Sequence, residues 1–380
     1  MQRKSFGLVI AVLAGISAQA SGPAISTLAA KPAAERAIIQ PAADGHAAVP
    51  QAGNPSGYFY VPPPGQAVNT SHPDQVIGKG TPASCTSAAV VQAGGIIRFN
   101  CGSKPVTILM KATAQIPNTS SSVVLDGGGL VTLSGGGSRR ILFSDTCLGK
   151  WSTQDCVNQP TPKIVVQNIT FEDGYAGTHQ VTCTTNSPPC WYGGVNGGGA
   201  IYVEGGQFKA VNSSFIGNQC YGDGPDLGGA AIRVLAQYDN RPVYITSDTF
   251  AGGRCSNGGA LSSIGVQWDV LNSVFTGNKA TGWGANPPSR GTAGGGSGGA
   301  IYNDGTNYGT LIAGTTMSGN TATEGGGAIF YVLDSGKGRL TIDDSHLANN
   351  TSGQFQTFPG IFDDTDGHHG PPAMINSTDS

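Results

Sequence analysis

Short apolar runs alternate with small polar residues along most of this chain. Runs of three to five residues, such as Ala200–Val203 and Leu340–Ile342, are separated by Gly, Asn, Ser and Thr. An amphipathic helix would place apolar residues three and four positions apart, and no such series occurs. The pattern therefore predicts short β-strands joined by tight turns.

Two sequence phrases recur in a fixed order and divide the chain into repeats. The first is Gly-Gly-Ala, or Gly-Ala-Ala in one copy, followed by a large apolar residue: Ile201, Ile232, Leu261, Ile301 and Ile329. The second is a large apolar residue among small polar ones, often ending in Gly-Asn, centred on Phe215, Phe250, Phe275, Met317 and Leu347. The closest copies lie 25 residues apart, at Phe250 and Phe275. Self-similarity at this period indicates a stack of structural units.

A unit of short strands with variable insertions fits one coil of a parallel β-helix, in which successive strands lie about 4.8 Å apart. We predict an all-β chain folded as a single-stranded, right-handed parallel β-helix of about eight coils. Phe171 and the second-phrase residues should form one interior stack. Asn and Gly tolerate positive φ and should form the corners of each coil. The expected corners are Asn168, Asn212, Ser247, Asn272, Gly314 and Asp344 before the stack, and Gly174, Asn218, Gly253, Asn278, Asn320 and Asn350 after it.

The N-terminus predicts export. Arg3 and Lys4 precede an apolar stretch from Phe6 to Ile16 and a small-x-small pattern at 18–20, which is typical of a signal peptide over residues 1–20. The Ala-, Pro- and Gly-rich residues 21–78 should form a flexible leader. Residues 79–163 should form N-terminal coils and a cap, 164–350 the regular repeats, and 351–380 a C-terminal cap or disordered tail. The mature protein is expected to be secreted, periplasmic or extracellular, and not an integral membrane protein.

The composition argues against nucleic acid as a partner and suggests disulfide bonds. A net charge of −3 without a basic patch makes nucleic acid an unsuitable partner. Eight cysteines in an exported chain favour disulfides, and no Cys-x-x-Cys zinc pattern occurs. Cys220 and Cys255 each lie five residues after a stacked Phe, so adjacent coils should bring them together. Proximity in sequence pairs the others as Cys85 with Cys101, Cys147 with Cys156, and Cys183 with Cys190.

Two families share these motifs. The segment 124–143, with Asp126-Gly127-Gly128-Gly129, resembles the entry coils of bacterial β-helix proteins of the pectin-lyase-like superfamily. The later Gly-Gly-Ala-Ile and Phe-x-Gly-Asn units resemble the repeats of polymorphic outer-membrane proteins. The resemblance covers roughly residues 94–350 and implies the β-helix fold. The superfamily includes lyases, hydrolases and adhesins, so the resemblance does not indicate which of these functions the chain has.

Signals for catalysis are weak. The Asp-rich signatures of polygalacturonases are not present, and the candidate carboxylates do not share one column. Asp223, Asp226 and Arg233 are the best catalytic candidates if the chain is a polysaccharide lyase or hydrolase, and a lyase would call for Ca²⁺. Otherwise no cofactor is predicted. Asp364-Thr365-Asp366-Gly367 resembles part of a calcium loop but lacks its distal Glu, so we predict no metal site.

An outer column of side chains suggests a binding surface. Strand alternation places the residue after each first-phrase apolar residue outside, at Tyr202, Arg233, Ser262, Tyr302 and Phe330. Exposed aromatic rings with an Arg suit a glycan, although the same residues also suit an ordinary sheet face. Insertions at one phase of the repeat carry Trp191, Tyr192, Trp283 and Arg290, which should wall this column. We therefore predict a non-enzymatic, adhesin-like protein that binds polysaccharide or cell-surface glycans. The enzyme and a purely structural role are the alternatives.

Overall fold

The computed structural model describes residues 52–87, 94–147, 155–177, 197–224, 227–285 and 294–379, which belong to one compact unit, Ala47–Ser380. These residues are all-β apart from the 3-10 turns η1 (Pro63–Gly65), η2 (Pro82–Ser84) and η5 (Tyr238–Asn240). In this part of the chain, no helix has the length and apolar character needed to cross a membrane.

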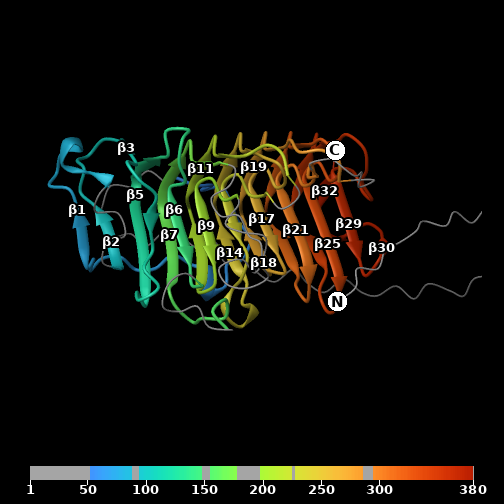
Figure 1. Cartoon of the computed structure of the whole chain (residues 1–380), viewed down its shortest axis with the longest axis horizontal. Helices are drawn as coiled ribbons and strands as arrows, with labels where there is room; N and C mark the ends of the chain where they lie inside the picture. The colour runs from blue at the N-terminus through green and yellow to red at the C-terminus, as the bar shows by residue number, and fades with distance from the viewer. Residues whose placement is uncertain are drawn as a thin grey trace, which may run out of the picture. The chain divides into compact units, whose positions relative to one another are not determined.

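Three parallel sheets run along the solenoid, and successive strands lie side by side in chain order (Figure 1). Sheet A is bent, so that each coil contributes one strand to each of its two halves. The strands of its first half are β1 (Gln75–Ile77), β2 (Gly95–Phe99), β5 (Ser122–Ser134), β7 (Lys163–Glu172), β10 (Gln207–Val211), β14 (Val243–Thr246), β18 (Trp268–Leu271), β22 (Thr310–Ala313), β26 (Leu340–Asp343) and β31 (Ala373–Ile375). The long strands β5 and β7 continue into the second half, with β3 (Val106–Leu109), β11 (Ser214–Ile216), β15 (Thr249–Ala251), β19 (Val274–Thr276), β23 (Thr316–Ser318), β27 (His346–Ala348) and β32 (Thr378–Asp379).

The other two sheets complete each coil. Sheet B contains β4 (Ala114–Gln115), β6 (Leu142–Asp145), β9 (Ile201–Glu204), β13 (Ile232–Val234), β17 (Leu261–Ile264), β21 (Ile301–Thr306), β25 (Ile329–Ser335), β29 (Ile361–Thr365) and β30 (His368–His369). Sheet C contains β8 (Tyr175–Ala176), β12 (Gln219–Cys220), β16 (Arg254–Cys255), β20 (Lys279–Ala280), β24 (Thr321–Ala322) and β28 (Thr351–Ser352). The predicted parallel β-helix is confirmed.

The predicted interior stack is also confirmed. Phe171, Phe215, Phe250 and Phe275 are buried, and their ring centroids lie 5.2, 4.7 and 4.7 Å apart along the stack. Met317 on β23 and Leu347 on β27 continue the interior stack in register with Phe275. The strand spacing sets the ring spacing, because each ring is carried at the same position of its coil.

The two corners use Asn differently. At the corner before the stack, all six predicted residues have positive φ, from 45° at Asp344 to 57° at Gly314. At the corner after it, positive φ falls one residue earlier than predicted, as at Gly217, Gly277 and Gly319. The following Asn has ordinary φ and turns its side chain into the coil, where it serves as a hydrogen-bonding group instead of a turn residue.

These Asn side chains form a ladder between coils. Asn320 Nδ2 donates to the Phe275 carbonyl at 3.1 Å, and Asn320 Oδ1 accepts from the backbone N–H of Asn278 at 3.0 Å. Asn278 and Asn350 repeat the contact with the Phe250 and Met317 carbonyls, at 3.1 and 2.9 Å. Each Asn therefore satisfies buried backbone groups that the sheet leaves unpaired at the corner.

Replacing Asn320 with Ala should lower the free energy of unfolding by about 2 kcal/mol, because it leaves a buried carbonyl and a buried N–H without partners. Urea unfolding followed by circular dichroism would measure the loss. Ser318→Ala on the outer side of the same coil is the matched control and should change stability by less than about 0.5 kcal/mol. Equal effects of the two substitutions would contradict the role of the ladder.

Residues 52–70, called the strap below, lie against the corners and strands of sheet A. Asn54 Nδ2 donates to the Asn272 carbonyl at 2.6 Å, and Asn272 Nδ2 donates to the Phe59 carbonyl at 2.8 Å. Lys209 Nζ donates to the Pro64 carbonyl at 2.9 Å. The flexible leader was predicted for 21–78. Its described part instead uses polar corner side chains as anchors, which the leader's own composition does not reveal.

The C-terminal residues continue the stack. Strands β29, β31 and β32 pair in parallel with the preceding coil, and β30 folds back on β29 as an antiparallel hairpin. Asp366 and Gly367 both have positive φ, as a two-residue hairpin turn of type I′ requires. The segment that resembles a calcium loop is therefore this hairpin, and it covers part of the last edge of sheet B.

Candidate functional site

The predicted outer column exists in register but is not uniformly exposed. Tyr202, Arg233, Ser262, Tyr302 and Phe330 lie at matching positions on β9, β13, β17, β21 and β25. Tyr202 is 0% exposed, Arg233 1% and Ser262 0%, whereas Tyr302 and Phe330 are partly exposed. The expectation that the whole column faces solvent is wrong for its first three members. Strand alternation tells which side of a strand a residue occupies, but not whether another segment covers that side.

A cluster of charged side chains is buried at the first half of this column. The Tyr202 hydroxyl donates to Glu204 Oε2 at 2.8 Å, and Asp145 lies beside Glu204 on the neighbouring strand β6. The Arg140 guanidinium lies over the Tyr202 ring at 5.1 Å and donates to the Gly197 carbonyl at 2.8 Å. All four side chains are no more than 3% exposed.

Burial shifts the pKa of these groups. The pKa of Glu204 is raised to about 7, mainly by burial and also by the neighbouring Asp145 carboxylate, while Tyr202 and Arg233 oppose the shift. Burial lowers the pKa of Arg140 to about 10. A buried carboxyl group with a raised pKa beside a second carboxylate is a common acid–base arrangement. Here, however, a sugar chain does not reach them, because Asp145 is 3% and Glu204 1% exposed.

The raised pKa of Glu204 predicts a pH dependence of stability. Between its ordinary pKa of 4.5 and its folded pKa of about 7, the folded state binds more protons than the unfolded state. Stability should therefore fall as the pH rises through this window, by about 3 kcal/mol in total. Glu204→Gln keeps an acceptor for Tyr202 and removes the titration, so it should stabilise the protein at pH 8 and change little at pH 4.

Urea unfolding of wild type and Glu204→Gln at pH 4, 6 and 8 would measure this effect. Glu172→Gln is the control, because Glu172 is partly exposed and burial raises its pKa less. A Glu204→Gln variant that unfolds with the same pH profile as wild type would show that Glu204 does not titrate in this window.

The second half of the column is an aromatic ladder. Tyr302, Phe330 and Phe362 stack face to face with centroids 5.0 and 5.1 Å apart. Phe355 packs edge-on against Phe362 at 4.8 Å. Because the rings cover each other's faces, they present edges to solvent. Sugar stacking requires a free ring face, so this ladder is better suited to supporting the sheet than to binding a glycan.

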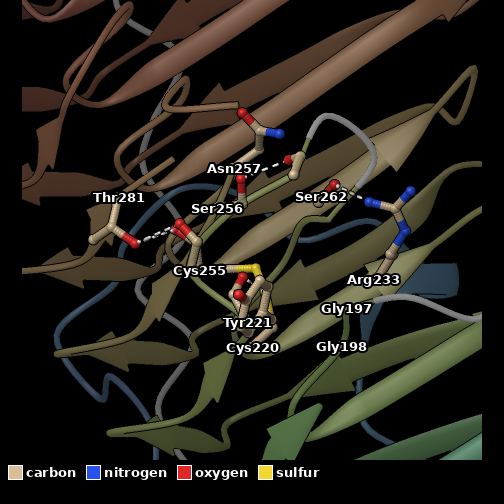
Figure 2. The surroundings of a disulfide bond; sticks show 12 residues. Gly197, Gly198, Cys220, Tyr221, Arg233, Cys255, Ser256, Asn257, Ser262 and Thr281 are labelled. Carbon is tan, nitrogen blue, oxygen red and sulfur yellow. Dashed lines mark hydrogen bonds between the residues drawn. A yellow bond between two sulfur atoms is a disulfide. The ribbon is translucent and has the colours of Figure 1, made fainter. Parts of the chain in front are cut away.

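The Cys220–Cys255 disulfide joins adjacent coils of sheet C, as predicted, with a Cα–Cα distance of 4.7 Å (Figure 2). The predicted pairs Cys85–Cys101 and Cys147–Cys156 also form, with Cα–Cα distances of 5.7 and 4.9 Å. Cys183 and Cys190 lie outside the described residues. Disulfides of this kind indicate an oxidising compartment.

Two loops beside this disulfide carry exposed aromatic rings. Tyr221 directly follows Cys220 and is 41% exposed, and Trp283 is 48% exposed. We call residues 221–224 and 281–285 the ledge. The single hydroxyl proton of Thr281 is shared between the Gly222 carbonyl, 3.3 Å from Oγ1, and the Cys255 carbonyl, 3.2 Å from it, so the two loops are tied to each other and to the disulfide (Figure 2). Neither ring stacks on another ring among the described residues.

The structure separates the predicted site residues into two groups. Trp283 and Asp223 lie on the ledge, where Asp223 is partly exposed in the loop of Tyr221. Arg233 lies away from it, on the buried column, with Nη1 donating to Ser262 Oγ at 3.1 Å (Figure 2). Trp191, Tyr192, Asp226 and Arg290 lie outside the described residues. Tyr221 was missed, although the shared phase of the insertions could have indicated it.

Comparison with known proteins finds a family model that matches part of the chain. The repeat model of the Chlamydia polymorphic membrane protein matches residues 314–331. This segment contains Met317 of the interior stack, Asn320 of the Asn ladder and the Gly-Gly-Ala-Ile phrase at Ile329, so the match covers the features that define one repeat. No curated protein and no solved structure matches. Among the described residues, no group of three or more His, Cys, Asp or Glu side chains is placed to hold a metal ion.

Proposed function

We propose that this chain is an exported, adhesin-like β-helix protein that binds glycans of a cell surface through the ledge. The repeat shared with the Chlamydia polymorphic membrane protein and the disulfides support a surface-associated, oxidising location. The observation that carries the proposal is the pair of exposed rings, Tyr221 and Trp283, on two loops fixed to each other and to a disulfide. Fixed aromatic rings bind sugar faces with little loss of conformational entropy.

The ligand is placed on the ledge and not on the outer column. The first half of the outer column is buried and offers no surface, and the second half presents only ring edges to solvent. The predicted walls of the site, Trp191, Tyr192 and Arg290, belong to insertions of the same phase as Trp283. They remain candidates for the rim of the same site.

Glycan-array binding of wild type, Trp283→Ala and Tyr221→Ala would test the proposal. Each substitution should weaken binding about tenfold, because each removes one aromatic face that stacks on the sugar and the apolar contact that goes with it. Tyr60→Ala is the matched control, because Tyr60 is 67% exposed on the strap and should leave binding unchanged. Wild-type binding that survives both ledge substitutions would overturn the proposal, as would the absence of any bound glycan.

Activity as a polysaccharide lyase or hydrolase remains the alternative function and can be tested directly. Of the predicted catalytic residues, Asp223 and Arg233 do not face a common space, since Arg233 is 1% exposed on the outer column. Incubation with polygalacturonate and Ca²⁺ should therefore leave the ultraviolet absorbance unchanged. A clear rise, as unsaturated products form, would favour a lyase over a binding protein.

A further inference from the structure

A cavity of about 550 Å³ lies between the outer face of sheet A and the strap. Its floor is a row of outward residues in register on four successive strands: Val124, Val165, Lys209 and Tyr244. Pro64 and Val68 of the strap form one wall. Cavities of this volume with a mainly apolar lining are typical of small-molecule sites.

The strap is held in place above this floor. Lys209 Nζ donates to the carbonyls of Pro64 and Gln66, at 2.9 and 2.5 Å. Gln167 exchanges two hydrogen bonds with the backbone of Val68, at 2.9 and 3.0 Å. The cavity is therefore a built feature of the fold, made by the same contacts that fix the strap.

The charged side chains that line the cavity are all basic. Lys163, Lys209 and Arg241 line the cavity, and its lining contains no Asp or Glu. Lys163 and Arg241 are exposed at the rim, and the Lys163 ammonium makes no ion pair or hydrogen bond with the described residues. The lining therefore attracts an anion, and Lys163 is available to bind it.

The two side-chain amides that line the cavity already have partners within the protein. Gln207 Nε2 donates to the Pro160 carbonyl at 2.8 Å, and its Oε1 accepts from Arg241 at 3.4 Å. Gln237 Oε1 accepts from the Phe208 N–H at 2.9 Å, and its Nε2 donates to the Ala236 carbonyl at 2.9 Å. A sugar chain needs many hydrogen-bond partners for its hydroxyls, and these amides do not supply them. An alkyl chain needs no hydrogen-bond partners.

We propose that this cavity binds an amphiphilic anion, of the class of medium-chain fatty-acid carboxylates. Its unbranched chain lies on the row from Val124 to Tyr244, beneath Pro64 and Val68. Its carboxylate meets Lys163 and Arg241 at the rim. This site is separate from the ledge and does not depend on the glycan proposal.

Isothermal titration of the exported chain with octanoate, decanoate and 1-octanol tests the assignment. Octanoate should bind more tightly than 1-octanol, and decanoate about tenfold more tightly than octanoate, because two further methylenes are buried. Lys163→Gln and Arg241→Gln should each weaken octanoate binding about tenfold and leave 1-octanol binding unchanged. Lys279→Gln on sheet C is the matched control and should change neither.

Three results would overturn the proposal. The first is no saturable binding of decanoate. The second is equal binding of octanoate and 1-octanol that is insensitive to Lys163 and Arg241. The third is displacement of decanoate by an acidic trisaccharide, which would make the cavity a sugar site. Trp283→Ala should leave decanoate binding intact, so failure at the ledge and failure at this cavity are distinguishable.

Discussion

Phe250→Ala should lower the free energy of unfolding by about 4–5 kcal/mol. Phe250 is 0% exposed, and both faces of its ring stack on neighbours, with centroids 4.7 Å from Phe215 and 4.7 Å from Phe275. Removal of the ring takes away buried apolar area, leaves a cavity between two coils and breaks two stacking contacts. A solenoid coil contacts only its neighbours, so distant coils do not compensate for this loss.

Phe330→Ala is the matched control, measured in the same urea titration by circular dichroism. Phe330 also stacks on both faces, at 5.0 Å from Tyr302 and 5.1 Å from Phe362, but it lies on the outer face and is partly exposed. We expect a loss of about 1–2 kcal/mol, because solvent fills the space that the ring leaves. Equal losses in the two variants would show that the interior stack contributes no more than an outer ladder.

Replacing both Cys220 and Cys255 with Ala should lower the free energy of unfolding by about 4 kcal/mol. The two residues are 35 positions apart, and this disulfide restricts a long loop in the unfolded chain. Both side chains are buried, so Ala avoids placing a new polar group in the core. The double variant and wild type are compared by urea unfolding without reductant.

The Cys147–Cys156 pair supplies the comparison. Its residues are 9 positions apart, so the same change to Ala should cost about 2–3 kcal/mol. The order of the two losses is the test. If the shorter loop proved the more costly, the stabilisation would come from contacts in the folded coils and not from restriction of the unfolded chain.

Together, the ledge and the strap cavity give the solenoid two separate surfaces. The ledge lies at sheet C beside the Cys220–Cys255 disulfide, and the cavity lies on the outer face of sheet A. Each surface is built from residues of several coils. A rigid stack positions such residues at the strand spacing, and for this reason loops and faces of β-helices serve as binding surfaces.

The sequence by itself determined the repeat, and through it the coil. The recurring phase of the two phrases predicted the interior stack, the positive-φ corners before it and the Cys220–Cys255 disulfide. These features follow from local rules, because residues at equivalent positions of stacked coils must lie above one another. Alternation along each strand likewise placed Tyr202 and Arg233 on the outer side of sheet B.

Only the tertiary structure decided what covers each outer face. Tyr202 and Arg233 are buried and Trp283 is exposed, although all three were predicted to face a ligand. Asn278 and Asn320, which each follow a corner Gly, form a ladder between coils, because a buried carbonyl of the preceding coil lies within reach of each side chain. Whether a face is covered, and which coils touch, depends on segments far apart in sequence, such as the strap that lies over Lys209. A local sequence pattern does not show which distant segments will meet in the folded chain.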